Sequence, residues 1–376
     1  MPPIRPLLLL LLLLRATCDP DTPSVSSALL SDTSSSFYNA EVYDSMSFEG
    51  VGTTMGYVDE VALAVSSPEF FANFKSSAHA PRIYTIFFHF YTSYHNTDST
   101  TPMDVAIQCV DQFSPHLLSK FRRLAAQERL GNPDRRKWRV PVPDPAWRDE
   151  DLDGVDDDAI RATEVEASVH VPKFLYELMT VEKAFGVIPG TRGFDGMNIM
   201  EIGGGYGGFA NTFSEFHDVK SYTVADLGTV NLLIEKYLTA TNSKAIKNGR
   251  FHTINAIAPY TPPSTPPDID LIVSFFCISE QSEDVQDEYI HRYITHAKRG
   301  YLQLNYDTGS PGHKFDVIRF FRKVWILHPS AVLLPPPPCS VYESHRITWG
   351  PDVGQLEMHE RFNRVPELWG AVPNWG

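Results

Sequence analysis

The chain has few cysteines, no excess of basic residues and no apolar run long enough to span a membrane. Its four cysteines are far apart and form no C-x-x-C pair, which excludes a cysteine-rich zinc site and a disulfide-stapled fold. The 32 Lys and Arg residues are outnumbered by 46 Asp and Glu residues, so the formal net charge of −14 would repel DNA or RNA at long range. We therefore expect a protein that depends on its hydrophobic core and does not bind nucleic acid.

What the sequence does contain is the composition of a folded protein. Hydrophobic residues make up 43% and charged residues 21% of the chain, values that exclude a wholly disordered or fibrous protein. The length of 376 residues favours one large domain or two modest ones.

The first eighteen residues have the pattern of a signal peptide. Arg5 precedes eight consecutive leucines, and a small-residue stretch ends at Cys18. Eight leucines followed by Arg15 are too few for a stable membrane span, which needs roughly 20 apolar residues. We expect residues 1–18 to direct the protein into the secretory pathway or out of the cell; the alternative is a leader without targeting value and a cytoplasmic protein. Residues 19–56 are Ser-rich, which is typical of a flexible linker.

Residues 57–148 are predicted to form a mainly helical N-terminal part. Apolar residues recur at helical spacing in Val58–Val65, and Ser67, with Pro after it, is typical of a helix start. A second amphipathic helix is predicted through Leu117–Ala125, and the aromatic run Ile83–Tyr94 is interpreted as buried core.

Residues 149–158 carry seven acidic residues in ten positions. The spacing of Asp149, Asp151 and Asp153 matches the first half of a calcium-binding loop, but Ile160 occupies the twelfth position, where a bidentate Glu is required. We therefore interpret this segment as an acidic linker and predict no metal.

Residues 159–350 show the alternation of strands and helices expected of an α/β domain, followed by a tail at 351–376. A helix at 174–185 comes first, and helices then separate most of the strands. This alternation implies a parallel sheet with helices on both faces, and the strongly apolar run Asp270–Phe275 indicates a central strand. The predicted strands are Asn198–Ile202, Ser221–Ala225, Phe251–Ile254, Asp270–Phe275 and Tyr301–Leu304, with Ala331–Leu334 and Arg346–Trp349 as an edge pair.

The first strand runs into the glycine cluster EIGGGYGG at Glu201–Gly208. Gly203, Gly205 and Gly208 satisfy G-x-G-x-x-G between a strand and a helix, which is the context of a nucleotide-binding turn. Glycines allow a tight turn and let a ligand lie against backbone N–H groups at a helix N-terminus. Asp226 ends the next strand, where a carboxylate can accept hydrogen bonds from a ribose. NAD and S-adenosylmethionine (SAM) both fit this geometry.

Glu201 favours SAM over NAD. A carboxylate two residues before the first glycine would repel a pyrophosphate, whereas SAM has no phosphate and its methionine portion is cationic. Two alternatives stay open: an NAD-dependent oxidoreductase, and a SAM-binding scaffold without catalytic activity.

With these motifs the chain resembles the sugar O-methyltransferase family of class I SAM-dependent methyltransferases. The similarity extends over about Phe174–Gly350 and is carried by EIGGGYGG, SYTVADL, DLIVSFFCISE, KRGYLQLN and ITWG. The resemblance implies an α/β fold with a Rossmann-like sheet of seven mostly parallel strands and helices on both faces. It also implies SAM as the cofactor and a sugar or glycan hydroxyl as the methyl acceptor.

Ligands of parallel α/β sheets lie outside the carboxyl ends of the strands, so we expect the site residues there. A sugar hydroxyl needs a general base, and Glu280, after the fourth strand, is the first choice for this catalytic role. The alternative role for Glu280 is a helix cap, and Asp307 and His313 are the reserve candidates for the base. The expected cofactor-binding residues are Glu201, Gly203, Gly204, Gly205, Tyr206, Gly207, Asp226, Leu227, Asn255, Ala256 and Phe276.

Overall fold

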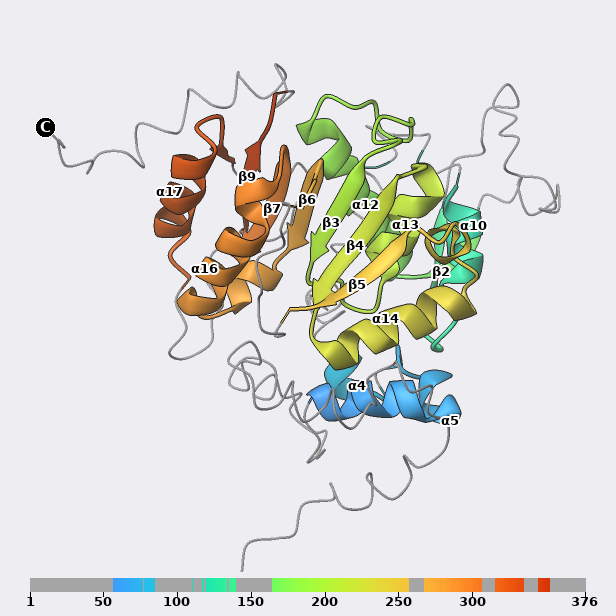
Figure 1. Cartoon of the computed structure of the whole chain (residues 1–376). Helices are drawn as coiled ribbons and strands as arrows, with labels where there is room; N and C mark the ends of the chain where they lie inside the picture. Colours follow the sequence, from blue (N-terminus) through green and yellow to red (C-terminus); the bar gives the residue numbers. More distant parts are fainter. Residues whose placement is uncertain are drawn as a thin grey trace, which may run out of the picture.

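A seven-stranded sheet with the order β5-β4-β3-β6-β7-β9-β8 is the centre of the molecule (Figure 1). The computed structural model describes residues 57–76, 78–84, 110, 117, 120–133, 135–139, 164–256, 267–305, 315–334 and 344–351. The strands of the sheet are β3 (Asn198–Ile202), β4 (Ser221–Asp226), β5 (Phe251–Asn255), β6 (Leu271–Phe275), β7 (Gly300–Asn305), β8 (Val332–Leu334) and β9 (Ser344–Trp349).

The sheet is mostly parallel, as predicted. Neighbours from β5 to β7 pair in parallel, and β9 alone among the seven runs antiparallel to its neighbours β7 and β8. The apolar strand β6 is central, and the pair β8 and β9 lies at one edge, so both predictions are confirmed. The fold class is therefore α/β with a Rossmann-like sheet of seven strands.

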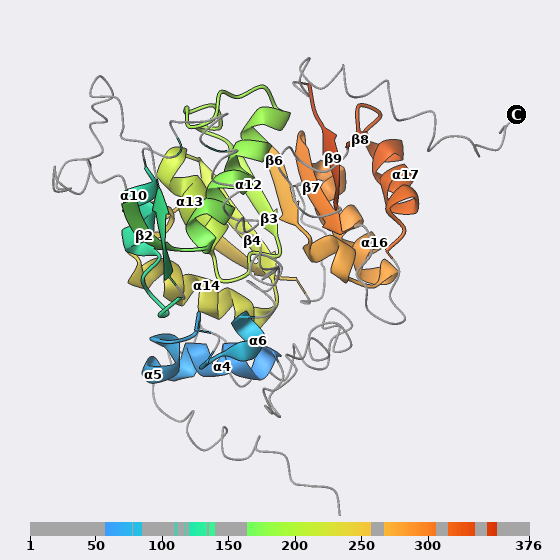
Figure 2. The ribbon, with the colours of Figure 1, turned by 180° about the vertical axis from the view of Figure 1, so that it is seen from behind.

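The two faces of the sheet bury different side chains, because successive residues of a strand point to opposite sides. Ile199 and Leu271 belong to the core that contains α12, α13 and α14, whereas Met200 and Ile272 belong to the core that contains α16 and α17. Figures 1 and 2 show these two helix layers from opposite sides. The helices are α12 (His170–Ala184), α13 (Gly208–Phe216), α14 (Gly228–Ala240), α16 (Glu283–Arg292) and α17 (Val317–Leu327).

The N-terminal part shares the first of these two cores. Its helices are α4 (Tyr57–Ser66), α5 (Pro68–Phe71), α6 (Pro81–Tyr84) and α10 (Phe121–Gln127). Helix α4 packs against α14 (Figure 1), and the Nζ of Lys236 in α14 donates to the carbonyls of Ala64 and Val65 at 2.9 and 2.7 Å. A cation at a helix C-terminus satisfies carbonyls that have no partner within the helix. The end of α4 is therefore fixed to the sheet domain.

A two-stranded antiparallel sheet adds strand structure to the mainly helical N-terminal part. Strand β1 (Arg135–Arg139) pairs with β2 (Glu164–Ser168), and the buried indole of Trp138 donates from Nε1 to the Ala167 carbonyl at 3.1 Å. The sequence analysis missed this sheet, because RRKWR has one apolar residue and no alternating pattern.

Several predicted segments lie outside the described residues: the leader 1–18, the linker 19–56, the acidic run 149–158 and residues 352–376. In the part of the chain that the structure describes, no helix combines the length and the apolar character that crossing a membrane requires.

Candidate cofactor and active site

The candidate site lies where the order of strands changes direction. From β3 the chain continues to β4 and β5 on one side, and β6 and β7 lie on the other side. The carboxyl ends of β3 and β6 therefore flank a topological switch point, which is the usual ligand site of an open α/β sheet. Gly203 follows β3 and Phe276 follows β6, so the topology brings two of the predicted site segments together.

The glycine turn needs a backbone that other residues adopt poorly. Gly203, Gly205 and Gly207 have φ angles of 79°, 58° and 90°. These values lie in the left-handed region, which glycine enters without a steric penalty. The Gly203 N–H donates to the Ala225 carbonyl at 3.0 Å, which fixes the start of the turn to β4, and α13 begins at Gly208.

Several of these glycines are also needed for close packing. A Cβ on Gly203 would lie 2.3 Å from the Cβ of Cys277, and one on Gly204 would lie 2.4 Å from the Cγ1 of Val224. A Cβ on Gly207 would meet Ile234 at 2.9 Å. The sequence interpretation, in which the glycines leave bare backbone for a ligand, therefore needs correction at these positions, where the neighbours are protein side chains.

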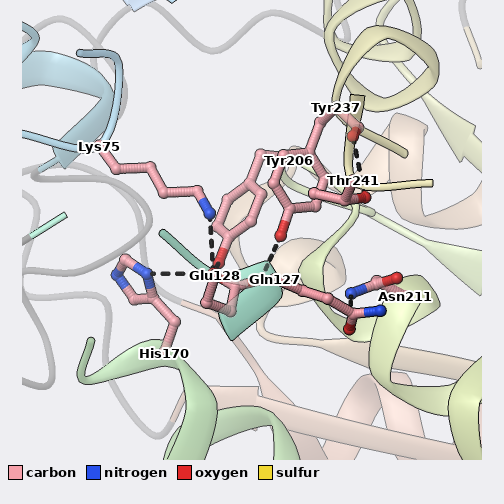
Figure 3. Close-up of polar contacts among 8 residues, drawn as sticks. All are labelled: Lys75, Gln127, Glu128, His170, Tyr206, Asn211, Tyr237 and Thr241. Carbon is pink, nitrogen blue, oxygen red and sulfur yellow. Dashed lines mark hydrogen bonds and ion pairs between the residues drawn. The ribbon is translucent and has the colours of Figure 1, made fainter. Parts of the chain in front are cut away.

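Tyr206 occupies the middle of the glycine turn, but its side chain points into the protein. The ring is buried against Phe74, Phe174 and Tyr237, and its hydroxyl donates to the Oε2 of Glu128 at 3.0 Å (Figure 3). The side chain is therefore committed to this buried cluster. Tyr206 can therefore contribute to the predicted cofactor site through its backbone.

Glu201 is buried near the end of β3, and it accepts a hydrogen bond from the Tyr222 hydroxyl at 2.8 Å. Burial raises the pKa of Glu201 to about 8, despite this hydrogen bond. At neutral pH the carboxyl is therefore mostly protonated in the free protein. The sequence argument that a fixed negative charge at Glu201 repels pyrophosphate loses force, although the acid remains able to ionise beside a cation.

The ends of β4 and β5 place Asp226 opposite Asn255. The Asp226 carboxylate accepts the N–H of Leu227 at 2.7 Å, and the Ala256 N–H donates to the Asp226 carbonyl at 2.9 Å. These four predicted residues are thus neighbours. The sequence analysis missed Asn231 of α14, whose Nδ2 donates to the carbonyls of both strands, at Asp226 and Ile254, and holds the two ends together.

The backbone is strained where β6 ends. Phe276 has φ 68°, which is uncommon for a residue with a Cβ and is found most often at functional sites. The Ser279 hydroxyl donates to the Phe276 carbonyl at 2.6 Å and accepts the Asn305 N–H at 3.0 Å. Ser279 therefore ties the strained segment to the end of β7.

Glu280 is half-buried in the 3-10 turn Cys277–Glu280. Burial raises its pKa to about 7, although a hydrogen bond with the Asn305 side chain and the charge of Lys173 act in the opposite direction. The alternative role as a helix cap is not what the structure shows, because Ser282 occupies the cap position of α16. Asp307 and His313, the reserve candidates, lie outside the described residues.

Acidic groups converge on the switch point. The pKa of the Cys277 thiol is raised, first by burial and then by the negative charges of Asp226, Glu280 and Glu201. The positive charge of Lys173 in α12 lowers the pKa of both Glu201 and Glu280, against the effect of burial. The sequence analysis missed this residue. Carboxyl groups at or just after the ends of three neighbouring strands therefore act on the Cys277 thiol. Within the described ranges, no group of three or more His, Cys, Asp and Glu residues is arranged to hold a metal.

Comparisons with known proteins give a likeness of fold to solved structures. No family model and no curated protein sequence matches the chain. The methyltransferase domain of the bacterial protein CtHen1 is 12% identical, with 47% of this chain and 96% of that chain covered and a TM-score of 0.36. The N-methyltransferase NodS from Bradyrhizobium japonicum, in complex with S-adenosyl-L-homocysteine, is 13% identical, with 48% of this chain and 88% of that chain covered and a TM-score of 0.35.

Proposed function

We propose that the protein is a SAM-dependent O-methyltransferase that acts on a hydroxyl of a sugar or glycan. The observation that carries the proposal is the placement of Glu201, Asp226 and Glu280 at or just after the carboxyl ends of the neighbouring strands β3, β4 and β6, at the switch point of the sheet. Burial raises the pKa of two of these acids, and a cationic ligand would stabilise their ionised forms. SAM carries a sulfonium and an ammonium group, so it fits such a site better than a dinucleotide with its negative pyrophosphate.

The sheet order supports the same choice. The dinucleotide-binding sheet has six strands in the order 3-2-1-4-5-6. Here the antiparallel strand β9 lies between β7 and β8, so this edge of the sheet differs from that arrangement.

The chain's own residues divide into two groups around the proposed cofactor. Asp226 and Asn255, at adjacent strand ends, are suited to the ribose and adenine portion, since a carboxylate there accepts hydrogen bonds from a ribose. Glu201 and the backbone of the glycine turn are suited to the charged methionine portion. Phe276, in its strained conformation, directly follows β6 at the same edge of the sheet.

Glu280 is the proposed general base. SAM supplies an activated methyl group, so the protein must align the acceptor oxygen and remove one proton. A base works best when its pKa is near the operating pH, and the pKa of about 7 for Glu280 meets this condition. The Asn305 side chain orients the carboxyl group. The sugar acceptor rests on the resemblance of the sequence segments, and the need for a base agrees with it, because a sugar hydroxyl is a poor nucleophile while protonated.

Two measurements test the proposal. Calorimetric titration should give micromolar binding of S-adenosyl-L-homocysteine and no binding of NAD; binding of NAD alone would overturn the cofactor assignment. Incubation with methyl-labelled SAM and a panel of free, nucleotide-linked and polymeric sugars should transfer label to at least one sugar. Binding without transfer to any hydroxyl compound would favour the non-catalytic scaffold.

We also propose that residues 1–18 direct the chain into the secretory pathway. The test is expression of the full chain and of a variant without residues 1–18 in secreting cells. Equal retention of both inside the cell would contradict this role.

A further inference from the structure

A buried ionic cluster lies behind the glycine turn. We call it the Glu128 cluster, and its members are Lys75, Glu128, His170, Tyr206 and Tyr237 (Figure 3). All five side chains are buried, and each comes from a different segment: the chain after α5, the end of α10, the start of α12, the glycine turn and α14.

The Glu128 carboxylate is the centre of the cluster. The Nζ of Lys75 lies 2.7 Å from Oε2, and the Tyr206 hydroxyl donates to the same oxygen at 3.0 Å. The Tyr237 hydroxyl donates to Oε1, and the Nδ1 of His170 lies 3.8 Å from Oε2. The Lys75 ammonium also lies 4.3 Å from the centre of each tyrosine ring, which is within the range of a cation–π interaction.

The cluster contains one ion pair, which Lys75 and Glu128 form. Burial alone would raise the pKa of Glu128, but the Lys75 ammonium and the neighbouring His170 hold it well below its usual range. Burial lowers the pKa of His170 to about 4, so the imidazole is neutral at pH 7. A buried ion pair of this kind contributes little net stability compared with apolar side chains of similar volume. Its presence therefore calls for an explanation other than stability.

The glycine turn supplies that explanation. Five of the six residues from Gly203 to Gly208 are glycines, and ordering such a segment costs more conformational entropy than ordering any other. Tyr206 is the one residue of the six with a side chain, and that side chain is held by Glu128. Through Tyr206, the other residues of the Glu128 cluster can therefore hold the glycine turn in one conformation.

Helix α10 holds the next turns of chain as well. The Nδ2 of Asn211 in α13 donates to the Oε1 of Gln127 at 3.3 Å, and the Nε2 of Gln127 donates to the Oε1 of Glu215 at 3.3 Å. The Lys75 N–H donates to the carbonyl of Gly131 at 2.8 Å, which fixes the lysine to the turn that follows α10. The same short segment therefore holds the glycine turn and the helix that follows it.

We propose that Lys75 and Glu128 are positioning residues, which set the conformation of the glycine turn through Tyr206 and thereby control the affinity for the cofactor. This inference rests on the proposed function. It makes the N-terminal part a component of the cofactor site through the contact of Glu128 with Tyr206.

The test compares two tyrosines that bind the same carboxylate. Tyr206→Phe removes one hydroxyl from Glu128 within the turn, and Tyr237→Phe removes the other from α14. If the cluster positions the turn, Tyr206→Phe weakens binding of S-adenosyl-L-homocysteine by about 10- to 100-fold, the usual cost of removing a group that orients a binding site. Tyr237→Phe has a clearly smaller effect on affinity, although both variants lose an equivalent hydrogen bond. Calorimetry is done well below the melting temperature of each variant.

A second measurement does not depend on the cofactor. Hydrogen exchange of the amides of Gly203–Gly208 in the unliganded protein should become faster in Tyr206→Phe and in Glu128→Gln. It should stay at the wild-type rate in Glu182→Gln, which alters a buried acid at the far end of α12. If the wild type fails to bind S-adenosyl-L-homocysteine, the proposed function is wrong, and exchange alone decides the positioning role. Unchanged exchange in Tyr206→Phe, or equal losses of affinity in the two tyrosine variants, overturns the inference.

Discussion

Acids removed from solvent occur in two regions next to the glycine turn, and their pKa values are shifted in opposite directions. In the Glu128 cluster the acid faces the buried Lys75 ammonium, which holds its pKa well below the usual range. At the switch point Glu201 is buried and Glu280 half-buried, no cation among the described residues pairs directly with either carboxyl group, and their pKa values rise to about 8 and 7. The charge of the acid is therefore compensated within the free protein in the Glu128 cluster but not at the switch point. The Glu128 cluster contains its own cation, whereas the acids at the switch point would gain one from the proposed SAM cofactor.

The largest effect is expected from Glu280. Glu280→Gln preserves the shape of the side chain but cannot accept a proton, so turnover should fall by roughly 10²–10⁴-fold at unchanged affinity for S-adenosyl-L-homocysteine. The matched control is Glu283→Gln. The ion pairs of Glu283 with Arg319 and Lys323 lie on the surface and contribute little to stability. Wild-type turnover in Glu280→Gln would place the base elsewhere, with Asp307 and His313 as the next residues to change.

The next effect concerns the cation of the Glu128 cluster. Lys75→Met leaves the Glu128 carboxylate buried without its partner, which should lower the free energy of unfolding by about 3–5 kcal/mol. Urea unfolding of the unliganded protein measures this loss. Adding Glu128→Gln to Lys75→Met removes the unpaired charge and should restore part of the stability. A double variant that is less stable than Lys75→Met would show that the charge of Glu128 is not the cause.

Asp226 should affect affinity more than stability. Asp226→Ala removes the proposed acceptor for the ribose hydroxyls, so binding of S-adenosyl-L-homocysteine should weaken by roughly 1.5–3 kcal/mol, as for hydrogen bonds to a charged group. Calorimetric titration provides the measurement. Asp218→Ala, just before β4, removes a surface partner of Arg250 and serves as the control. Equal affinities of Asp226→Ala and wild type would remove Asp226 from the site.

The smallest effect, taken per pH unit, is a dependence of stability on pH. The folded-state pKa of Glu201 is about 8, above the ordinary value of 4.5, so between these values the folded state binds a proton that the unfolded state has lost. Stability should therefore fall as the pH rises through this window, by up to about 1.4 kcal/mol per pH unit from this group.

Glu201→Gln tests that dependence. Burial also raises the pKa of Glu60 and Glu182, which add slopes of the same sign, so the difference between variant and wild type isolates Glu201. Urea unfolding at several pH values between 5.5 and 7.5 should give a shallower decline for Glu201→Gln; parallel curves would contradict the raised pKa of Glu201.

The sheet and its strand ends were predictable because their signals are local. Short strand patterns between helical segments gave β3, β4 and β6 to within a residue, and the glycine run between a strand and a helix indicated the turn. The proximity of Asp226 and Asn255 was predicted from the rule that parallel strands end at the same edge of a sheet.

The Glu128 cluster was not predictable from the sequence. Lys75, Glu128 and His170 are far apart along the chain, and charged residues in helical segments usually indicate a solvated face. Their burial follows from the packing of α10 against α12 and the glycine turn. A tertiary contact of this kind leaves no periodic pattern in the sequence. The commitment of Tyr206 to this cluster was missed for the same reason.

The small antiparallel sheet has a consequence for dividing the chain. Arg139 of β1 lies opposite Glu164 of β2, so the residues on either side of the interval 140–163 are hydrogen-bonded neighbours. A single cut in this interval leaves two fragments that meet along β1 and β2 and share one core. The two fragments should therefore stay associated after cleavage, and this interval is the natural place to split the protein into two complementing halves.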